Sequence, residues 1–326
     1  MATFTPFTQD ELLAYFDRIN YSQRDPSPSG LPAPTIENLC QLIVNHQQAI
    51  PFENLTIHYS SNHTINIEPQ ALYNKIVLNR RGGYCFENNG LFARVLRSLG
   101  YKLWTGAASV VLEAKVEVQD GQPTIKAPPM THQITIVQLP TTAQDGGDSE
   151  DRQDALWLVD VGFGGQTLPA PKMLVEHEIT PGVRPEQFRF TRVHLASNVR
   201  QENPPYWLLE YRYKPDSPWM SAVVFDLTER SHTDYYVANQ YMSTNPESKF
   251  VKNVMMARLR RDEDGVLTRV LLLNDILKLR RDGETKLIQQ FEREHERVKA
   301  IEEWFGIKLS EEDIGGMKGR SVALME

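Results

Sequence analysis

The sequence predicts an α+β fold, because the spacing of its apolar residues changes twice along the chain. Up to about residue 100 these residues recur every three or four positions, as on helix faces, and from 101 to about 228 they alternate, as in strands. The remainder mixes both patterns. We therefore expect a helical bundle over 1–100, a central antiparallel β-barrel-like domain over 101–228 and an α/β lid over 229–326.

Two helices of the first part have clear start signals. Thr8 precedes a helix expected over Gln9–Ile19, and Thr35 precedes one expected over Ile36–Ala49. A threonine hydroxyl at this position accepts a hydrogen bond from the free N–H groups of the first helical turn. These two helices and a third one after Gly83 would form the bundle.

Six segments of the central part alternate apolar and polar residues. They are Ser109–Val118, His132–Leu139, Leu156–Val161, Phe188–Leu195, Tyr206–Tyr213 and Met220–Phe225. Consecutive hairpins of this kind predict a closed or strongly curved sheet. In the last part a strand over Val266–Leu273 precedes an amphipathic helix expected over Thr285–Phe305. Its inward face would consist of Leu287, Phe291, Val298, Ile301 and Phe305.

Composition and charge argue against several functional classes. The 326 residues are 40% hydrophobic, which is enough for more than one core, and no run approaches the ~18 apolar residues of a membrane span. The first residues have neither the basic head nor the apolar centre of a signal peptide, so we expect a cytoplasmic protein with its two cysteines reduced. A net charge of −7 argues against a nucleic-acid partner, and no metal-binding motif occurs.

Cys85 lies where a glycine pair, Gly82 and Gly83, meets a helix. Four apolar residues that share a face define this helix: Phe92, Val95, Leu96 and Leu99. In a first helical turn, free N–H groups and the positive end of the helix dipole favour a thiolate. The glycines would let the chain turn sharply and leave room for a substrate. The same pattern also fits a buried, inert cysteine.

A nucleophilic cysteine needs a base, and His132 is the best placed of the eight histidines. It opens a strand in which His132, Ile134 and Ile136 share one face. Asp160 lies near the end of the strand Leu156–Val161, and a buried carboxylate needs a hydrogen-bonding or cationic partner. That partner is either the N–H groups of the following glycine turn or the imidazole of His132. Taken singly, His132 also fits a core histidine with its hydrogen bonds satisfied.

Cys, His and Asp are the three residue types of an activated thiol nucleophile, in which the base contacts the sulfur and the carboxylate orients the base. The surrounding motifs resemble those of the arylamine N-acetyltransferases. The resemblance rests on segments that occur in the family's order: Pro51–Leu55, Arg81–Cys85, Thr131–His132, Val159–Gly164 and Ser243–Ser248. The polar run from Thr141 to Asp151 lengthens one loop without touching a motif.

This resemblance implies a cysteine-protease-like catalytic core with Cys85, His132 and Asp160 as the triad. It implies ping-pong transfer of an acyl group from acyl-coenzyme A, acetyl-coenzyme A first of all, to an arylamine or arylhydrazine, as in xenobiotic detoxification. No metal and no obligate protein partner is implied. The long chain and its charged last third resemble microbial eukaryotic members, some of which use malonyl-coenzyme A.

The resemblance also implies residues beside the triad. Arg81 and Asn89 would shape the site, and Phe52 and Phe163 would line the acceptor pocket. Ser243 and Thr244 are the residues that we expect to contact coenzyme A. The basic residues that follow, Lys249, Lys252, Arg258, Arg260 and Arg261, are either a phosphate-binding surface or a solvated face.

Two other functions fit the same three residues. A Cys-His-Asp hydrolase or transamidase would turn over amides or esters without coenzyme A. A binding protein that keeps the three residues as buried structure would have an unreactive Cys85.

Overall fold

The structure of the protein is a computed structural model that describes residues 5–22, 30–112, 114–140, 154–200, 202 and 204–326. The first hundred residues form the helices α1 (Gln9–Arg18), α2 (Ile36–Ala49), α3 (Leu55–His58), α4 (Pro69–Leu72) and α5 (Cys85–Ser98), with a π-helical segment at Tyr73–Leu78. The hydroxyl of Thr8 accepts a hydrogen bond from the Glu11 N–H, and that of Thr35 accepts one from the Asn38 N–H. Both predicted helix starts are confirmed.

The larger sheet has ten strands in the order β3-β4-β9-β10-β11-β2-β5-β6-β7, with β8 paired to β9. Their bounds are β2 Lys102–Val110, β3 Val116–Gln119, β4 Gln122–Ile125, β5 His132–Pro140, β6 Asp154–Val159, β7 Lys172–Met173, β8 Thr180–Pro181, β9 Gln187–Leu195, β10 Tyr206–Arg212 and β11 Met220–Phe225. Five of the six predicted strands, all but Ser109–Val118, lie within two residues of these bounds. The strand predicted at Ser109–Val118 is wrong, because a turn between Val110 and Val116 separates β2 from β3.

The expected closure of this sheet is not found. Within the described part of the chain, no strand pairing joins the terminal strands β3 and β7. β7 is only two residues long and pairs with β6 alone, while β3 pairs only with its hairpin partner β4. The mixed helix and strand content is confirmed, but the sheet is open.

The second sheet has the order β1-β12-β13-β14-β15. Its strands are β1 Phe52–Glu53, β12 Met255–Arg261, β13 Leu267–Leu273, β14 Ile276–Arg281 and β15 Glu284–Gln290. Phe52 pairs with Ala257, so a strand that precedes Cys85 is part of the C-terminal sheet.

The helix predicted over Thr285–Phe305 is wrong in its first half, which is strand β15. The turn Asp282-Gly283 joins β14 to β15, and both residues have a positive φ, as in a tight hairpin turn. Helix α8 (Glu294–Ala300) and a π-helical turn (Ile301–Phe305) follow. Leu287 is consequently 61% exposed, whereas Phe291, Ile301 and Phe305 are buried as predicted.

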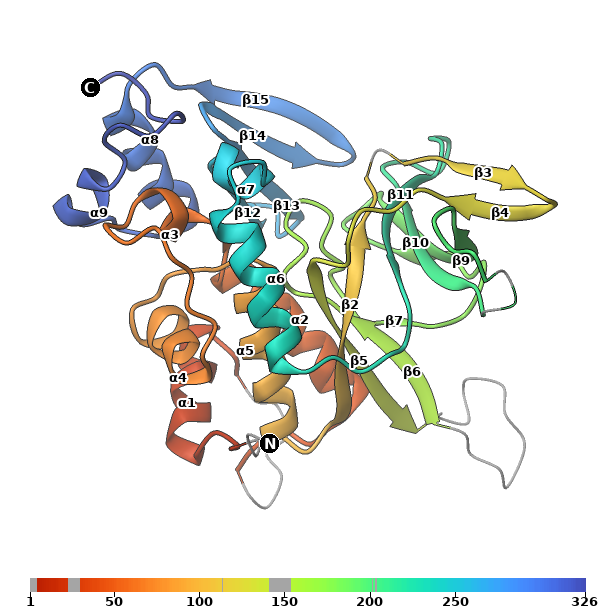
Figure 1. Cartoon of the computed structure of the whole chain (residues 1–326). Helices are drawn as coiled ribbons and strands as arrows, with labels where there is room; N and C mark the ends of the chain where they lie inside the picture. Colours follow the sequence, from red (N-terminus) through yellow and green to blue (C-terminus); the bar gives the residue numbers. More distant parts are fainter. Residues whose placement is uncertain (1–4, 23–29, 113, 141–153, 201, 203) are drawn as a thin grey trace.

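Figure 1 shows helices α8 and α9 (Glu311–Gly315) on the opposite side of the molecule from the β3–β4 hairpin, with α6 (His232–Thr244) crossing in front between them. Helices α1, α2 and α5 share a buried cluster with Val137, Leu139 and Val159 of strands β5 and β6. This packing holds the middle and end of α5 against those two strands. The division at residues 100 and 228 stays a prediction. None of the helices in the described residues is long and apolar enough to cross a membrane.

Candidate active site

Cys85 is the first residue of α5 and is 2% exposed. Tyr84, the residue before Cys85, has an extended backbone. Its N–H donates to the Glu87 carboxylate at 3.1 Å, and this hydrogen bond caps the N-terminus of the helix. The Cys85 sulfur lies 4.0 Å from the carbonyl oxygen of Thr131, the residue before His132. Cys40, the other cysteine, is also a free thiol.

Two glycines are required here by close packing. A Cβ on Gly82 would lie 2.2 Å from the Pro51 carbonyl oxygen, and one on Gly83 would lie 2.6 Å from the Glu87 Cβ. The Gly83 carbonyl accepts the Glu53 N–H at 2.9 Å. The space around this glycine pair is therefore filled by the protein itself, and neither glycine has a positive φ. The expected sharp turn with room for substrate is replaced by a tight junction with β1.

His132 and Asp160 meet as the strand pattern allowed. Strands β5 and β6 are antiparallel with Thr135 opposite Val159, so His132 at the start of β5 lies near the residue that follows β6. His132 Nε2 is 2.6 Å from Asp160 Oδ2. Since this contact uses Nε2, Nδ1 is the ring nitrogen left for Cys85. Both side chains are at most 4% exposed.

Asp160 has further donors that hold it in place. Its Oδ1 accepts hydrogen bonds from the Asn89 side chain and from the Gly162 N–H, both at 2.9 Å. A Cβ on Gly162 would lie 2.8 Å from the Cα of Cys85, so the loop after β6 rests directly on the start of α5. The two possible partners of Asp160, the glycine turn and His132, are therefore both used.

The electrostatics favour a protonated His132. Burial lowers its pKa, but the charge of Asp160, its hydrogen bond to Asp160 and a hydrogen bond with Cys85 outweigh burial and raise the pKa to about 10. At neutral pH the imidazolium thus lies between a carboxylate and the sulfur.

Two aromatic residues named from the sequence lie at this site. The Phe163 ring meets the His132 ring edge to face, with centroids 5.3 Å apart. Phe52 belongs to the same buried cluster as Cys85, Tyr84 and Phe86. Its ring also lies against Gly164, where the φ of +78° disfavours a side chain and a Cβ would lie 3.2 Å from the ring.

The other named residues make contacts within the protein. Arg81 lies 3.5 Å from the Asp313 carboxylate of α9. Ser243 is buried and Thr244 is exposed, and each hydroxyl donates to a carbonyl one turn earlier in α6, at 2.7 Å and 2.6 Å. Asn89 bonds Asp160 and the backbone of the neighbouring strand and loop.

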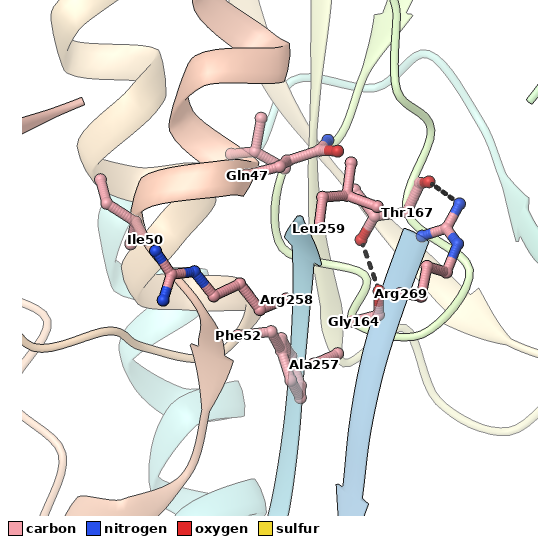
Figure 2. A pocket seen from close by; sticks show the side chains of 10 residues that line it. Gln47, Ile50, Phe52, Gly164, Thr167, Ala257, Arg258, Leu259 and Arg269 are labelled. Carbon is pink, nitrogen blue, oxygen red and sulfur yellow. Dashed lines mark hydrogen bonds between the residues drawn. The ribbon is translucent and has the colours of Figure 1, made fainter. Parts of the chain in front are cut away.

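Two cavities lie close to these residues. Figure 2 shows the smaller one, where α2 meets β12, β13 and the Gly164 loop, with Gln47 and Arg269 on its wall. Its ≈ 10 Å³ is about the space that one water molecule needs, so no acyl group fits. The larger cavity, ≈ 220 Å³, has His132 on its wall. Its other larger side chains are Phe86, Met130, Arg230, Asp234 and Tyr235.

None of those five residues was predicted from the sequence. Phe86 and Met130 stand next to Cys85 and close to His132 in the chain, so their position was a usable signal. Arg230, Asp234 and Tyr235 come from the start of α6 and its approach, far from the motifs in sequence. No sequence signal pointed to them.

Lys75, Glu53 and Glu87 form a charged cluster next to the first turn of α5. Lys75 Nζ lies 2.6 Å from Glu87 and 3.6 Å from Glu53, and both carboxylates are buried. Burial raises the pKa of Glu87, Lys75 lowers it, and the charge of Glu53 raises it further. The lysine is therefore shared by two acids that hold β1 and the first turn of α5.

Known proteins share this fold and these motifs. Residues 35–314 match the family model described as N-acetyltransferase, so the protein is an acyltransferase. It is 34% identical over 305 residues to the arylamine N-acetyltransferase of Mycobacterium tuberculosis (strain ATCC 25618 / H37Rv), covering 94% of this chain and 91% of that one. It is 30% identical over 330 residues to N-malonyltransferase FDB2 of Gibberella moniliformis, with the same coverage.

Solved structures of arylamine N-acetyltransferases have the same fold as this chain. The arylamine N-acetyltransferase from Salmonella typhimurium superposes with a TM-score of 0.74 at 27% identity, covering 95% of this chain and 98% of that chain. The Mycobacterium marinum arylamine N-acetyltransferase in complex with CoA gives a TM-score of 0.72 at 29% identity, covering 96% and 100%. The chain belongs to the arylamine N-acetyltransferase family, and the resemblance seen in its motifs is confirmed.

Proposed function

We propose that the protein transfers an acyl group from acyl-coenzyme A through a thioester on Cys85 to the nitrogen of an arylamine or arylhydrazine. The observation that carries this proposal is the hydrogen-bonded array of Asp160, His132 and Cys85 at the start of α5. The M. marinum relative bound to CoA supports coenzyme A as the carrier of the acyl group. The acyl group is acetyl in the primary proposal and malonyl in the alternative.

In the first half-reaction the Cys85 thiolate attacks the thioester carbonyl of the donor. A bond forms between Cys85 Sγ and the carbonyl carbon, the carbon–sulfur bond to coenzyme A breaks, and the leaving thiolate takes the proton from His132. Free N–H groups at the first turn of α5 would donate to the oxyanion. His132 is then neutral and Cys85 is acylated.

In the second half-reaction the amine nitrogen attacks the Cys85 thioester. His132 takes one proton from the nitrogen as the new carbon–nitrogen bond forms, and the Cys85 thiolate leaves. Asp160 keeps the ring oriented and stabilises the imidazolium that reappears. Phe163 and Phe52, which lie beside this array, would stack against an aromatic acceptor and keep water out.

The test is the intact mass of the protein after brief incubation with equal acetyl- and malonyl-coenzyme A without amine, beside Cys85→Ala. We expect one adduct on the unmodified protein and none on the variant, and the adduct mass identifies the acyl group. Adding an aromatic amine should remove the adduct. If the protein forms no adduct but hydrolyses esters or amides, a Cys-His-Asp hydrolase replaces this proposal.

A further inference from the structure

Lys249 is a cation beside the nucleophile that the proposed mechanism leaves without a role. It is the first residue of the short helix α7 (Lys249–Lys252), and its side chain is exposed. Its Nζ lies 5.4 Å from the centroid of the Phe250 ring. The Phe250 ring in turn lies 5.2 Å from the ring of Tyr84, the residue before Cys85. Phe250 and Cys85 belong to one buried cluster.

The charge of Lys249 is coupled to the sulfur. Burial lowers the pKa of Lys249, and a negative charge on Cys85 opposes this shift. The Nζ of Lys249 lies over the ring of Phe250, which belongs to the aromatic cluster that also contains Tyr84 and Cys85. This geometry puts one positive charge beside the group that is acylated.

Among the described residues, Lys249 differs from Lys252, Arg258 and Arg261 in that its Nζ has neither an ion-pair nor a hydrogen-bond partner. Within the described residues it makes no ion pair, while Lys252 on the same helix lies 2.5 Å from Glu247. Arg258 donates to the Gln48 carbonyl at 2.6 Å, and Arg261 donates to the Gly265 carbonyl at 2.9 Å. A lysine held near a reactive sulfur without a carboxylate is free to bind one that a substrate brings.

We propose that Lys249 binds the free carboxylate of a dicarboxylic acyl group carried by the donor and then by Cys85, and so favours malonyl over acetyl transfer. This inference rests on the proposed function and selects its malonyl alternative over the acetyl one. A malonyl thioester carries its carboxylate two carbons beyond the reacting carbonyl, so a cation near the sulfur can reach it, whereas an acetyl thioester offers nothing to bind. The N-malonyltransferase at 30% identity supports the same acyl class.

The experiment measures single-turnover acylation of Cys85 by acetyl-, propionyl- and malonyl-coenzyme A, with the adduct followed by intact mass. The variants are Lys249→Met, which removes the charge, Lys249→Arg, which keeps it, and Lys252→Met as the matched control on the same helix. We expect Lys249→Met to lower the malonyl-to-acetyl rate ratio by roughly tenfold, the loss of a charge-assisted hydrogen bond. Lys249→Arg should retain most of the ratio, and Lys252→Met should leave it unchanged.

All three donors share coenzyme A, so any effect on coenzyme A binding cancels in the ratio. Equal slowing of the three donors in Lys249→Met would overturn the inference, because Lys249 would then act on coenzyme A or on the thiol. An unchanged ratio would also overturn it. In both cases an acetyl adduct on Cys85 keeps the proposed function standing, whereas no adduct from any donor would reject both.

Discussion

The side-chain amide of Asn89 donates to Asp160 Oδ1 at 2.9 Å and to the Gln133 carbonyl at 2.6 Å, while its oxygen accepts the Val161 N–H at 2.9 Å. Asn89 is one helical turn after Cys85, so the two side chains share a face of α5. One amide therefore fixes the strand of His132 and the loop of Asp160 relative to the nucleophile. Its polar atoms are all occupied within the protein, which makes it a positioning residue.

Asn89→Ala should weaken both the fold and the activity. It leaves the Gln133 carbonyl and the Val161 N–H without partners, which we expect to cost about 1–3 kcal/mol of unfolding free energy. A shifted Asp160 should slow acylation of Cys85 by about 10–100-fold. Chemical denaturation and single-turnover acylation measure the two effects. Asn45→Ala is the control, since Asn45 donates only to the Asn20 carbonyl at the surface, and an Asn89→Ala protein acylated at the normal rate would contradict the role.

Gly162→Ala should be destabilising although the change is one methyl group. The added Cβ would lie 2.8 Å from the Cα of Cys85 and 2.9 Å from the Asn89 amide nitrogen, and backbone must move to relieve it. We expect a loss of about 1–3 kcal/mol, typical of overpacking. Gly315→Ala is the matched control, because its added Cβ meets nothing within 4 Å. Equal thermal stability of the two variants would contradict the close approach.

The ionisation of His132 should appear in the pH dependence of stability. Its pKa is raised from 6.5 to about 10 in the folded protein, so its contribution to stability is complete below about pH 6.5 and is lost as the pH rises through about 10. Between these limits the unmodified protein should lose up to ~1.4 kcal/mol per pH unit relative to His132→Gln. Denaturation at several pH values tests this. His177→Gln, which changes an exposed histidine, is the matched control for the loss of an imidazole.

Local patterns predicted the parts of the site that lie within one element. The capping threonines, the apolar face of α5 and the strand of His132 each depend on residues close in sequence, and the structure has them where expected. The pairing of β5 with β6 followed from their succession along the chain. With both strands predicted correctly and paired, the contact between His132 and Asp160 could be expected.

What sequence reasoning missed depends on contacts between distant segments. The need for glycine at Gly82 comes from the Pro51 carbonyl, and at Gly162 from the start of α5, so neither can be read from local turn chemistry. The prediction of a closed sheet was wrong because closure depends on the lengths of the edge strands. The error at β15 was avoidable, since Asp282-Gly283 is a hairpin signal that should have outweighed the helical spacing of Leu287.

Lys75→Met should destabilise the support beneath Cys85 in a pH-dependent way. The change removes the cation between Glu53 and Glu87 and leaves two buried carboxylates facing each other, which we expect to cost about 3–5 kcal/mol at neutral pH. Burial already raises the pKa of Glu87 in the folded protein, and Lys75 opposes that shift. Without Lys75 the pKa should rise further.

A carboxyl group whose pKa is raised by folding favours the folded state below its unfolded pKa, and that contribution is lost as the pH rises through the folded value. The stability deficit of Lys75→Met should therefore be largest at neutral pH and smaller at acidic pH, where Glu87 takes up a proton. Urea denaturation at both pH values measures it. Lys102→Met removes an exposed pair with Asp154 at 3.5 Å and should cost ~1 kcal/mol or less at either pH. A deficit in Lys75→Met that stays constant with pH would mean that its loss does not depend on the protonation of Glu87.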